Sequence, residues 1–227
     1  MATGRVPCGF ETTTPPTALA IRDPQALATP QRNMRGPLSF DAEARRLIRE
    51  SFMPGATEGE AAALIRVAEA LRLDPFKRQI HFVKRKSKNE ATGAWEERWA
   101  FQTAIDGFRS IAEDTGEFRG TDEPKFTYEE CINPATGEPT GKKELVARVM
   151  VYRKDFDEPF VGIARYHEFV QTKADGAPMA MWARAPHNML AKCAEAQAFR
   201  KAFPQNLAGV LSDDEVRDER DVTPPSV

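Results

Sequence analysis

The sequence is poor in the residues that hold metal ions or form disulfides. Its 227 residues include three cysteines and three histidines. The cysteines, Cys8, Cys131 and Cys193, are too far apart for a paired-cysteine zinc motif, and their odd number does not indicate a disulfide framework. The histidines are equally isolated, and none belongs to an HExxH motif. We therefore expect neither a metal site nor a catalytic residue.

Long apolar runs are also absent, and the net charge of the chain is small. No segment approaches the roughly 20 apolar residues that span a bilayer, and the N-terminus lacks the apolar core of a secretion signal. The 32 Lys and Arg residues nearly balance the 34 Asp and Glu residues, for a net charge of −2. This balance excludes a histone-like protein but not a local basic patch. We expect a soluble protein of the reducing cytosol with no membrane partner.

Motifs for nucleotide binding and covalent catalysis are absent too. Segment 137–142 has three residues between its glycines where a phosphate loop has four, and no Ser or Thr follows its lysine. It also lies between predicted strands and not before a helix. No GxSxG or Cys–His pattern indicates a nucleophile. We expect a protein that is not an enzyme and requires no cofactor, although the sequence leaves a dependence on Mg²⁺ open.

Composition divides the chain into three parts. Residues 1–37 hold six of the 17 prolines and no apolar period, which predicts a flexible arm. Residues 38–211 carry the periodic apolar patterns of a folded core domain. Residues 212–227 carry six acidic residues and two arginines, which predicts an acidic tail.

The core domain predicts an α+β fold. Apolar spacing indicates helices over 44–52, over 57–71 after the capping box Thr57-x-x-Glu60, over 103–115 with Thr103 as N-cap, and over 186–203. Alternation indicates strands at 79–86, through Trp99 and Phe101, at 144–153 and at 160–164. These elements predict an antiparallel sheet of hairpins packed with helices, with a long C-terminal helix.

The most informative charges lie between residues 77 and 88, where six cations occur without an acid. On an extended strand Arg78, Lys84 and Lys86 share one face with the apolar Ile80 and Phe82. Such a row can follow the phosphates of a nucleic acid. A solubilising edge strand is the alternative. The candidate DNA-binding residues here are Lys77, Arg78, Lys84, Lys86 and Lys88.

A second basic group lies on the last helix and just before it. Lys192 and Arg200 project about 80° apart around the helix. Arg200 flanks the apolar face, so it is either a paired, buried arginine or a cation lining a groove. Trp182 could stack on a base, although core packing is the simpler interpretation.

Three segments in order resemble the RecT/Redβ family of single-strand annealing proteins. Residues 73–80, LDPFKRQI, are similar to the family's "LNPWTKEIY"-type element, and residues 105–109, IDGFR, to its "VDGW" helix entry. The strongest match is PHNMLAKCA at 186–194. It continues through Gln197, Arg200 and Phe203 into AGV at 208–210 and DDE at 213–215. The order holds from about residue 51 to 215, with extra residues in the hairpin at 87–99.

The resemblance implies ATP-independent binding of single-stranded DNA and annealing of a complementary strand in a positively charged groove. It implies a homo-oligomeric ring or filament in a bacterial host cell, with a 5′–3′ exonuclease and a single-strand-binding protein as partners. Arg78 and Lys86 match DNA-contacting lysines, and Arg200 matches a groove arginine; Arg109 joins the candidate DNA-binding residues. His187 and Cys193 stand where a family member has lysine, which weakens the groove's charge.

Two alternatives remain at this point. The acidic turn of Asp155, Asp157 and Glu158 could serve a DNA-processing nuclease of recombination, although a solvated turn is the simpler interpretation. The chain could also be a replication-associated scaffold that binds protein and not DNA. Salt-dependent binding of single strands would be absent from such a scaffold.

Overall fold

We analysed a computed structural model of the chain, which describes residues 36–88, 93–133, 135–173 and 175–210. These residues all belong to one compact unit, Arg32–Val227. Except for residues 36 and 37, the predicted arm lies outside the described residues, as does the predicted acidic tail.

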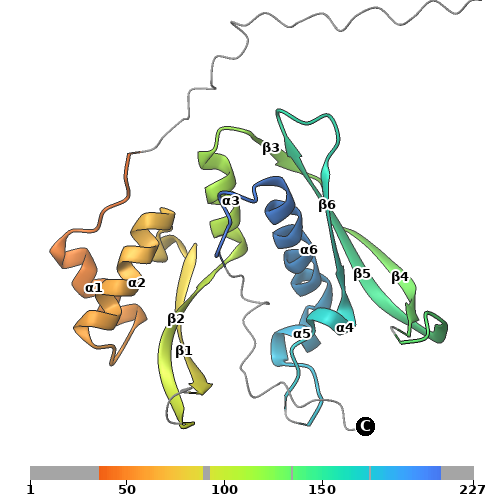
Figure 1. Ribbon diagram of the computed structural model, residues 1–227, viewed down its shortest axis with the longest axis horizontal. Coiled ribbons are helices and arrows are strands. Elements are labelled where there is room, and N and C mark those ends of the chain that lie inside the picture. Colours follow the sequence, from red (N-terminus) through yellow and green to blue (C-terminus); the bar gives the residue numbers. More distant parts are fainter. Residues whose placement is uncertain (1–35, 89–92, 134, 174, 211–227) are drawn as a thin grey trace, which may run out of the picture. The chain divides into compact units, whose positions relative to one another are not determined.

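The unit combines helices with two antiparallel sheets, which confirms the predicted α+β fold (Figure 1). The helices are α1 (Ala42–Phe52), α2 (Glu58–Leu71), the 3-10 turn η2 (Pro75–Lys77), α3 (Ile105–Asp114), α4 (Tyr166–Phe169), α5 (Ala180–Arg184) and α6 (Pro186–Ala202). The strands are β1 (Ile80–Lys88), β2 (Trp95–Thr103), β3 (Phe118–Thr121), β4 (Lys125–Ile132), β5 (Pro139–Arg153) and β6 (Phe160–Arg165).

Local capping explains where the second helix begins and ends. Thr57 accepts a hydrogen bond from the Glu60 backbone N–H, and the Glu60 carboxylate accepts one from the Thr57 N–H, which forms the predicted capping box. Arg72 ends the helix in the left-handed conformation, at φ 59°. Asp74 then caps the short turn η2, which leads the chain into β1.

The larger sheet is organised around the long strand β5. Strands β3 and β4 pair with its C-terminal and N-terminal parts, and β6 pairs with residues 146–151. Leu145, Ala147 and Val149 of β5 belong to one buried cluster with Leu190 and Ala194 of α6. Helix α6 therefore covers one face of this sheet and lies between it and α3 (Figure 1).

Small residues allow α6 to lie unusually close to β6. A Cβ atom built on Gly162 would lie 1.8 Å from the Ala194 carbonyl oxygen and 2.6 Å from the Ala198 nitrogen. Both contacts are with helix backbone, so no side-chain rotation could relieve them. The alanines of α6 are thus a packing surface.

We expect Gly162→Ala to lower the free energy of unfolding by about 1–3 kcal/mol, because the helix must move away from the sheet. Urea unfolding measures this change. Gly59→Ala is the matched control: Gly59 lies in α2 with no atom within 4 Å of the added Cβ, so it should stabilise by up to about 1 kcal/mol. Equal effects at the two glycines would contradict the close-packing explanation.

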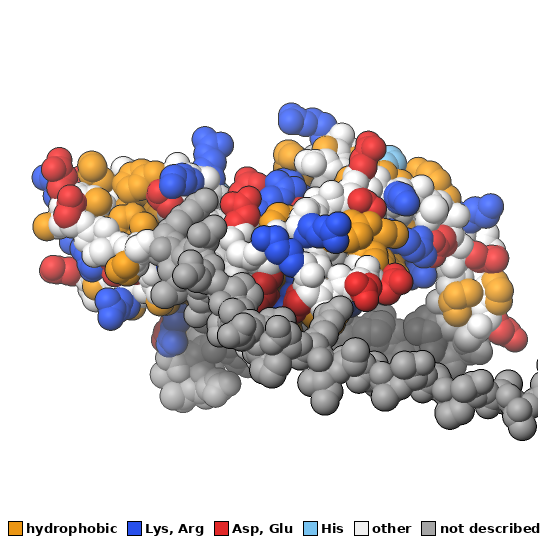
Figure 2. Space-filling view, turned by 90° about the horizontal axis from the view of Figure 1, so that it is seen from above, with side chains coloured by type: hydrophobic (Ala, Val, Ile, Leu, Met, Phe, Trp, Pro, Cys, Tyr) orange, Lys and Arg blue, Asp and Glu red, His pale blue; other side chains and the backbone are white. Residues whose placement is uncertain are grey.

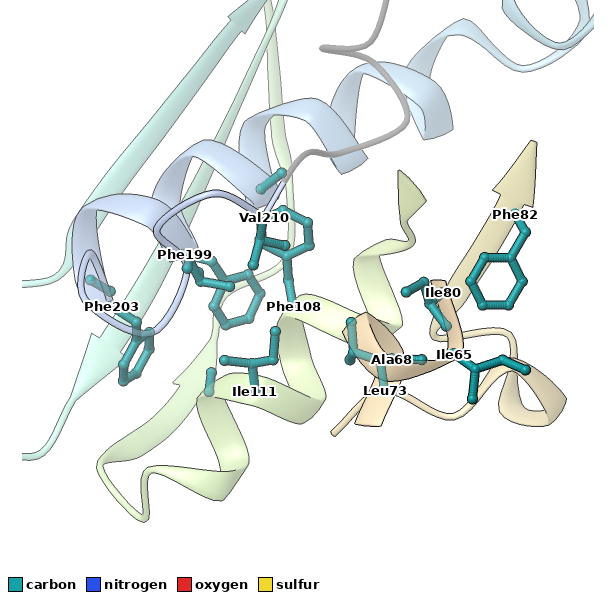
Figure 3. Packing of buried hydrophobic residues seen from close by; sticks show 14 of the residues in the cluster. Ile65, Ala68, Leu73, Ile80, Phe82, Phe108, Ile111, Phe199, Phe203 and Val210 are labelled. Atoms are coloured by element: carbon teal, nitrogen blue, oxygen red, sulfur yellow. The ribbon is translucent and has the colours of Figure 1, made fainter. Parts of the chain in front are cut away.

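The main core joins the helices to the hairpin β1–β2. Figure 3 shows Phe108 and Ile111 of α3 beside Phe199 and Val210, with Ile65 of α2 near Ile80 and Phe82 of β1. All these side chains belong to one buried cluster. The base of the hairpin is therefore part of the core, while its far end extends beyond it.

Several predicted boundaries differ from the structure. Strands β3 and β4 were not predicted: β3 is only four residues long, and most side chains of β4, apolar ones included, are exposed. Strand β1 begins at Ile80 and not at residue 79, and the hairpin strands extend further into the predicted loop 87–97. Ala104, not Thr103, caps α3; the Thr103 side chain is buried in the strand that precedes the helix.

Candidate nucleic-acid interface

The hairpin β1–β2 brings basic and aromatic residues together on one face. In the antiparallel register Lys84 lies opposite Trp99, Lys86 opposite Glu97 and Lys88 opposite Trp95. Since side chains alternate between the faces of a strand, these pairs share the face on which Ile80 and Phe82 are buried nearer the core. We call Lys84, Lys86, Trp95 and Trp99 the lysine–tryptophan face.

Contacts within this face position its cations. The Lys84 ammonium lies 5.3 Å from the centroid of the Trp99 ring, a cation–π contact. Lys86 Nζ lies 3.7 Å from Glu97 Oε1, and both side chains are about half exposed, so this ion pair is weak and open to exchange. The pKa of Glu60 in α2 is lowered, mainly by hydrogen bonds from Thr57 and to a lesser extent by Lys84.

The two cations before β1 are placed differently from the prediction. Arg78 does not share the strand face: it ends η2 in the left-handed conformation, at φ 58° and ψ 28°, and its side chain is exposed. Lys77 lies in η2 with its Nζ 3.7 Å from Asp74 Oδ2. Ile80 and Phe82, predicted as an apolar middle of the basic face, are buried in the core. The predicted face is therefore wrong for Arg78 and holds from Ile80 to Lys86, with its apolar part buried.

Trp95 and Trp99 were not among the predicted site residues. Only the register of the hairpin places these tryptophans opposite the lysines of β1. That register cannot be derived from the sequence unless the position of the turn is known. Trp99 is partly buried against the main core, whereas Trp95 is 47% exposed. The side chain of Lys88 is not among those described, so only its strand position is known.

Arg109 takes part in an ion pair inside the fold. Its guanidinium donates to both carboxylate oxygens of Glu195, each at 2.8 Å, and to Asp106 at 3.0 Å. The Glu195 side chain is 8% exposed, and the hydrogen bonds that Arg109 donates to this carboxylate raise the pKa of Arg109. The pair joins α3 to α6, so this candidate has a structural partner; a contact with DNA stays a prediction.

Arg200 is also held by the protein. Its guanidinium donates to the Val210 carbonyl oxygen at 2.6 Å and lies 5.4 Å from the centroid of the Phe108 ring. The two interpretations offered by the sequence were an ion pair and a groove cation. In the structure these two contacts connect the segment after α6 to α3, and a role of Arg200 in DNA binding stays a prediction. Lys192, on the same helix, is exposed.

Trp182 is buried. It is 1% exposed in the cluster beneath the larger sheet, where Tyr166 packs against its ring edge-to-face at 5.9 Å. In this structure the ring presents no face to a base, which agrees with the simpler of its two interpretations.

The acidic turn after β5 is tied to an arginine. Asp155 accepts two hydrogen bonds from Arg153, at 2.9 and 2.7 Å, and Arg153 also donates to Glu117. Within the described residues no three His, Cys, Asp or Glu side chains are grouped to hold a metal ion. No helix among those residues is long and apolar enough to cross a membrane.

Charges of both signs are mixed on the face of the molecule that Figure 2 shows. On the described part of the face shown in Figure 2, Lys and Arg side chains lie among Asp, Glu and apolar residues. This agrees with the net charge of −2. No wide basic surface is seen on the described part of this face, so the strongest candidate is the lysine–tryptophan face, with Lys77 and Arg78 just before strand β1.

The comparisons with known proteins agree with the resemblance seen in the sequence. The sequence model of the RecT family matches residues 38–227, which is most of the chain and all of the described elements. No curated protein sequence matches the chain. The chain belongs to the RecT family, the single-strand annealing proteins of phage-type DNA recombination.

Proposed function

We propose that this protein binds single-stranded DNA and anneals it to a complementary strand without ATP. The observation that carries the proposal is the family match over residues 38–227. The lysine–tryptophan face supplies two cations on one strand at a spacing that suits a phosphate backbone, and Arg78 adds an exposed cation just before that strand. Annealing breaks and forms no covalent bond, so it requires only that charge repulsion between strands be reduced while base edges remain open.

The hairpin suits this role because its cations are accessible. Lys84 and Lys86 lie two residues apart on one strand, about 7 Å along its axis. The partner of Lys86 is the half-exposed Glu97, so a phosphate can replace that carboxylate with little change in free energy. Lys84 lies over the Trp99 ring, and this contact favours one placement of its ammonium group before DNA binds.

Assembly and partners are part of the same proposal. The protein acts as a homo-oligomer, a ring or a filament, so that the cations of successive subunits follow one DNA strand. It works in the cytoplasm of a bacterial host, on strands exposed by a 5′–3′ exonuclease and covered by a single-strand-binding protein. Nothing in the proposed reaction requires a cofactor.

The test is annealing of two complementary fluorescent oligonucleotides in a stopped-flow instrument without nucleotide. We expect the protein to speed duplex formation and both oligonucleotides to remain full length, with or without Mg²⁺. Shortened strands in Mg²⁺ would instead support a nuclease. Absence of any salt-dependent binding to single strands would support a protein-binding scaffold.

A further inference from the structure

The far end of the hairpin presents a large aromatic side chain next to cations. Trp95 is 47% exposed although tryptophan is among the most buried side chains on average. It lies on the same face as Lys84 and Lys86, at the start of the strand that returns from the tip. A single exposed apolar residue needs no explanation. An exposed indole on the same face of the hairpin as two lysines, however, indicates a candidate binding surface.

The two tryptophans of this face have different surroundings. The face of the Trp99 ring is occupied by the Lys84 ammonium, and the ring is partly buried against the core. Trp95 lies four residues away on the same strand, about 13 Å along its axis. Trp99 thus lies against a cation, and 47% of the Trp95 surface is accessible to an outside group.

We propose that Trp95 stacks on an unpaired base of the bound strand while Lys84 and Lys86 contact its phosphates. This inference rests on the proposed binding of single-stranded DNA and adds the part of the nucleotide that the hairpin recognises. Every base has a flat π face, so stacking is tolerant of sequence, as annealing requires. A base inside a duplex has its faces covered by its neighbours, so the contact favours single strands.

Stacking and phosphate contacts differ in their response to salt. A phosphate contact releases counterions, so its loss reduces the slope of log affinity against log salt by about 0.7 on single strands. Stacking of a base on an aromatic ring releases no counterions. Removing the Trp95 ring should therefore lower affinity equally at every salt concentration, while removing a lysine should change the slope.

The experiment compares Trp95→Leu, Trp95→Phe and Lys86→Ala by fluorescence anisotropy of labelled oligo(dT) over a series of salt concentrations. Trp95→Leu keeps an apolar side chain without a ring, and we expect it to weaken binding about fivefold or more with an unchanged slope. Trp95→Phe should stay within about twofold of the parent. Lys86→Ala should reduce the slope by about 0.7.

Controls separate this inference from the proposed function. Tyr128→Leu removes a 67% exposed aromatic side chain from β4 in the other sheet, and its affinity should match the parent. Affinity of a duplex should be the same for Trp95→Leu and the parent. Urea unfolding should show equal stability for all variants, since Trp95 and Tyr128 are exposed.

Unchanged oligo(dT) affinity of Trp95→Leu would overturn the stacking role, and so would a change in its salt slope. An equal loss at Tyr128, or a changed oligomer size at full affinity, would also reject it in favour of general surface or subunit contacts. None of these results bears on whether the parent protein binds single strands. Failure of the parent to bind would refute the proposed function itself.

Discussion

Replacing Arg109 by alanine is expected to lower the free energy of unfolding by about 2–3 kcal/mol. The change leaves the Glu195 carboxylate, whose side chain is 8% exposed, without the bidentate arginine that joins α3 to α6. Breaking a fully buried pair costs about 3–5 kcal/mol. Arg109 itself is 46% exposed, so water can reach the orphaned carboxylate and reduce the cost. Urea unfolding measures the difference.

Glu195→Gln tests whether Arg109 is structural or contacts DNA. Both variants disrupt the ion pair, but only Arg109→Ala removes the cation. We expect both to lose stability and neither to change the salt slope of single-strand binding. A slope reduced by about 0.7 in Arg109→Ala alone would instead confirm the DNA contact predicted from the sequence. A double variant, Arg109→Leu with Glu195→Leu, should recover part of the stability because no unpaired charge remains.

Replacing Arg78 by glycine is expected to change stability and DNA binding in opposite directions. Arg78 has a left-handed backbone, at φ 58°, which costs a side-chain-bearing residue about 1–2 kcal/mol and glycine nothing. The free energy of unfolding of the variant should therefore rise by up to about 1 kcal/mol. The rise is smaller than the relieved strain because glycine gives the unfolded chain more conformational freedom. Affinity for oligo(dT) should fall about tenfold, the loss of one charge-assisted phosphate contact, with the slope reduced by about 0.7.

Arg72→Gly is the matched control. Arg72 has the same left-handed backbone, at φ 59°, but its side chain pairs with Asp114 within the fold. Its affinity for DNA should not change. Arg78→Lys should retain most of the binding without the gain in stability. If Arg78→Gly binds DNA as tightly as the parent, an arginine at this strained position has no role in DNA binding.

Patterns spanning a few residues were sufficient for the four longer helices and for most of the hairpin, whereas the short helices α4 and α5 were not predicted. The capping box at Thr57 and the proline at the start of α6 act within one turn of helix, so the sequence alone locates both helix starts correctly. The alternation in β5 and β6 also predicted strands, because their inward residues are buried against α6. The family was recognisable for the same reason: its motifs are short and local.

Contacts between distant segments required the tertiary structure. Arg109 and Glu195 are 86 residues apart, and nothing near either residue indicates the other. Trp99 lies over Lys84 only because the hairpin pairs in this register; a shift of one residue would place the ring on the opposite face. Arg78 was predicted on the strand, but the cap of η2 turns it away. The sequence thus determined which cations and aromatic residues are present, while pairing and packing decided which element each of them occupies, which of them hold the fold and which reach solvent.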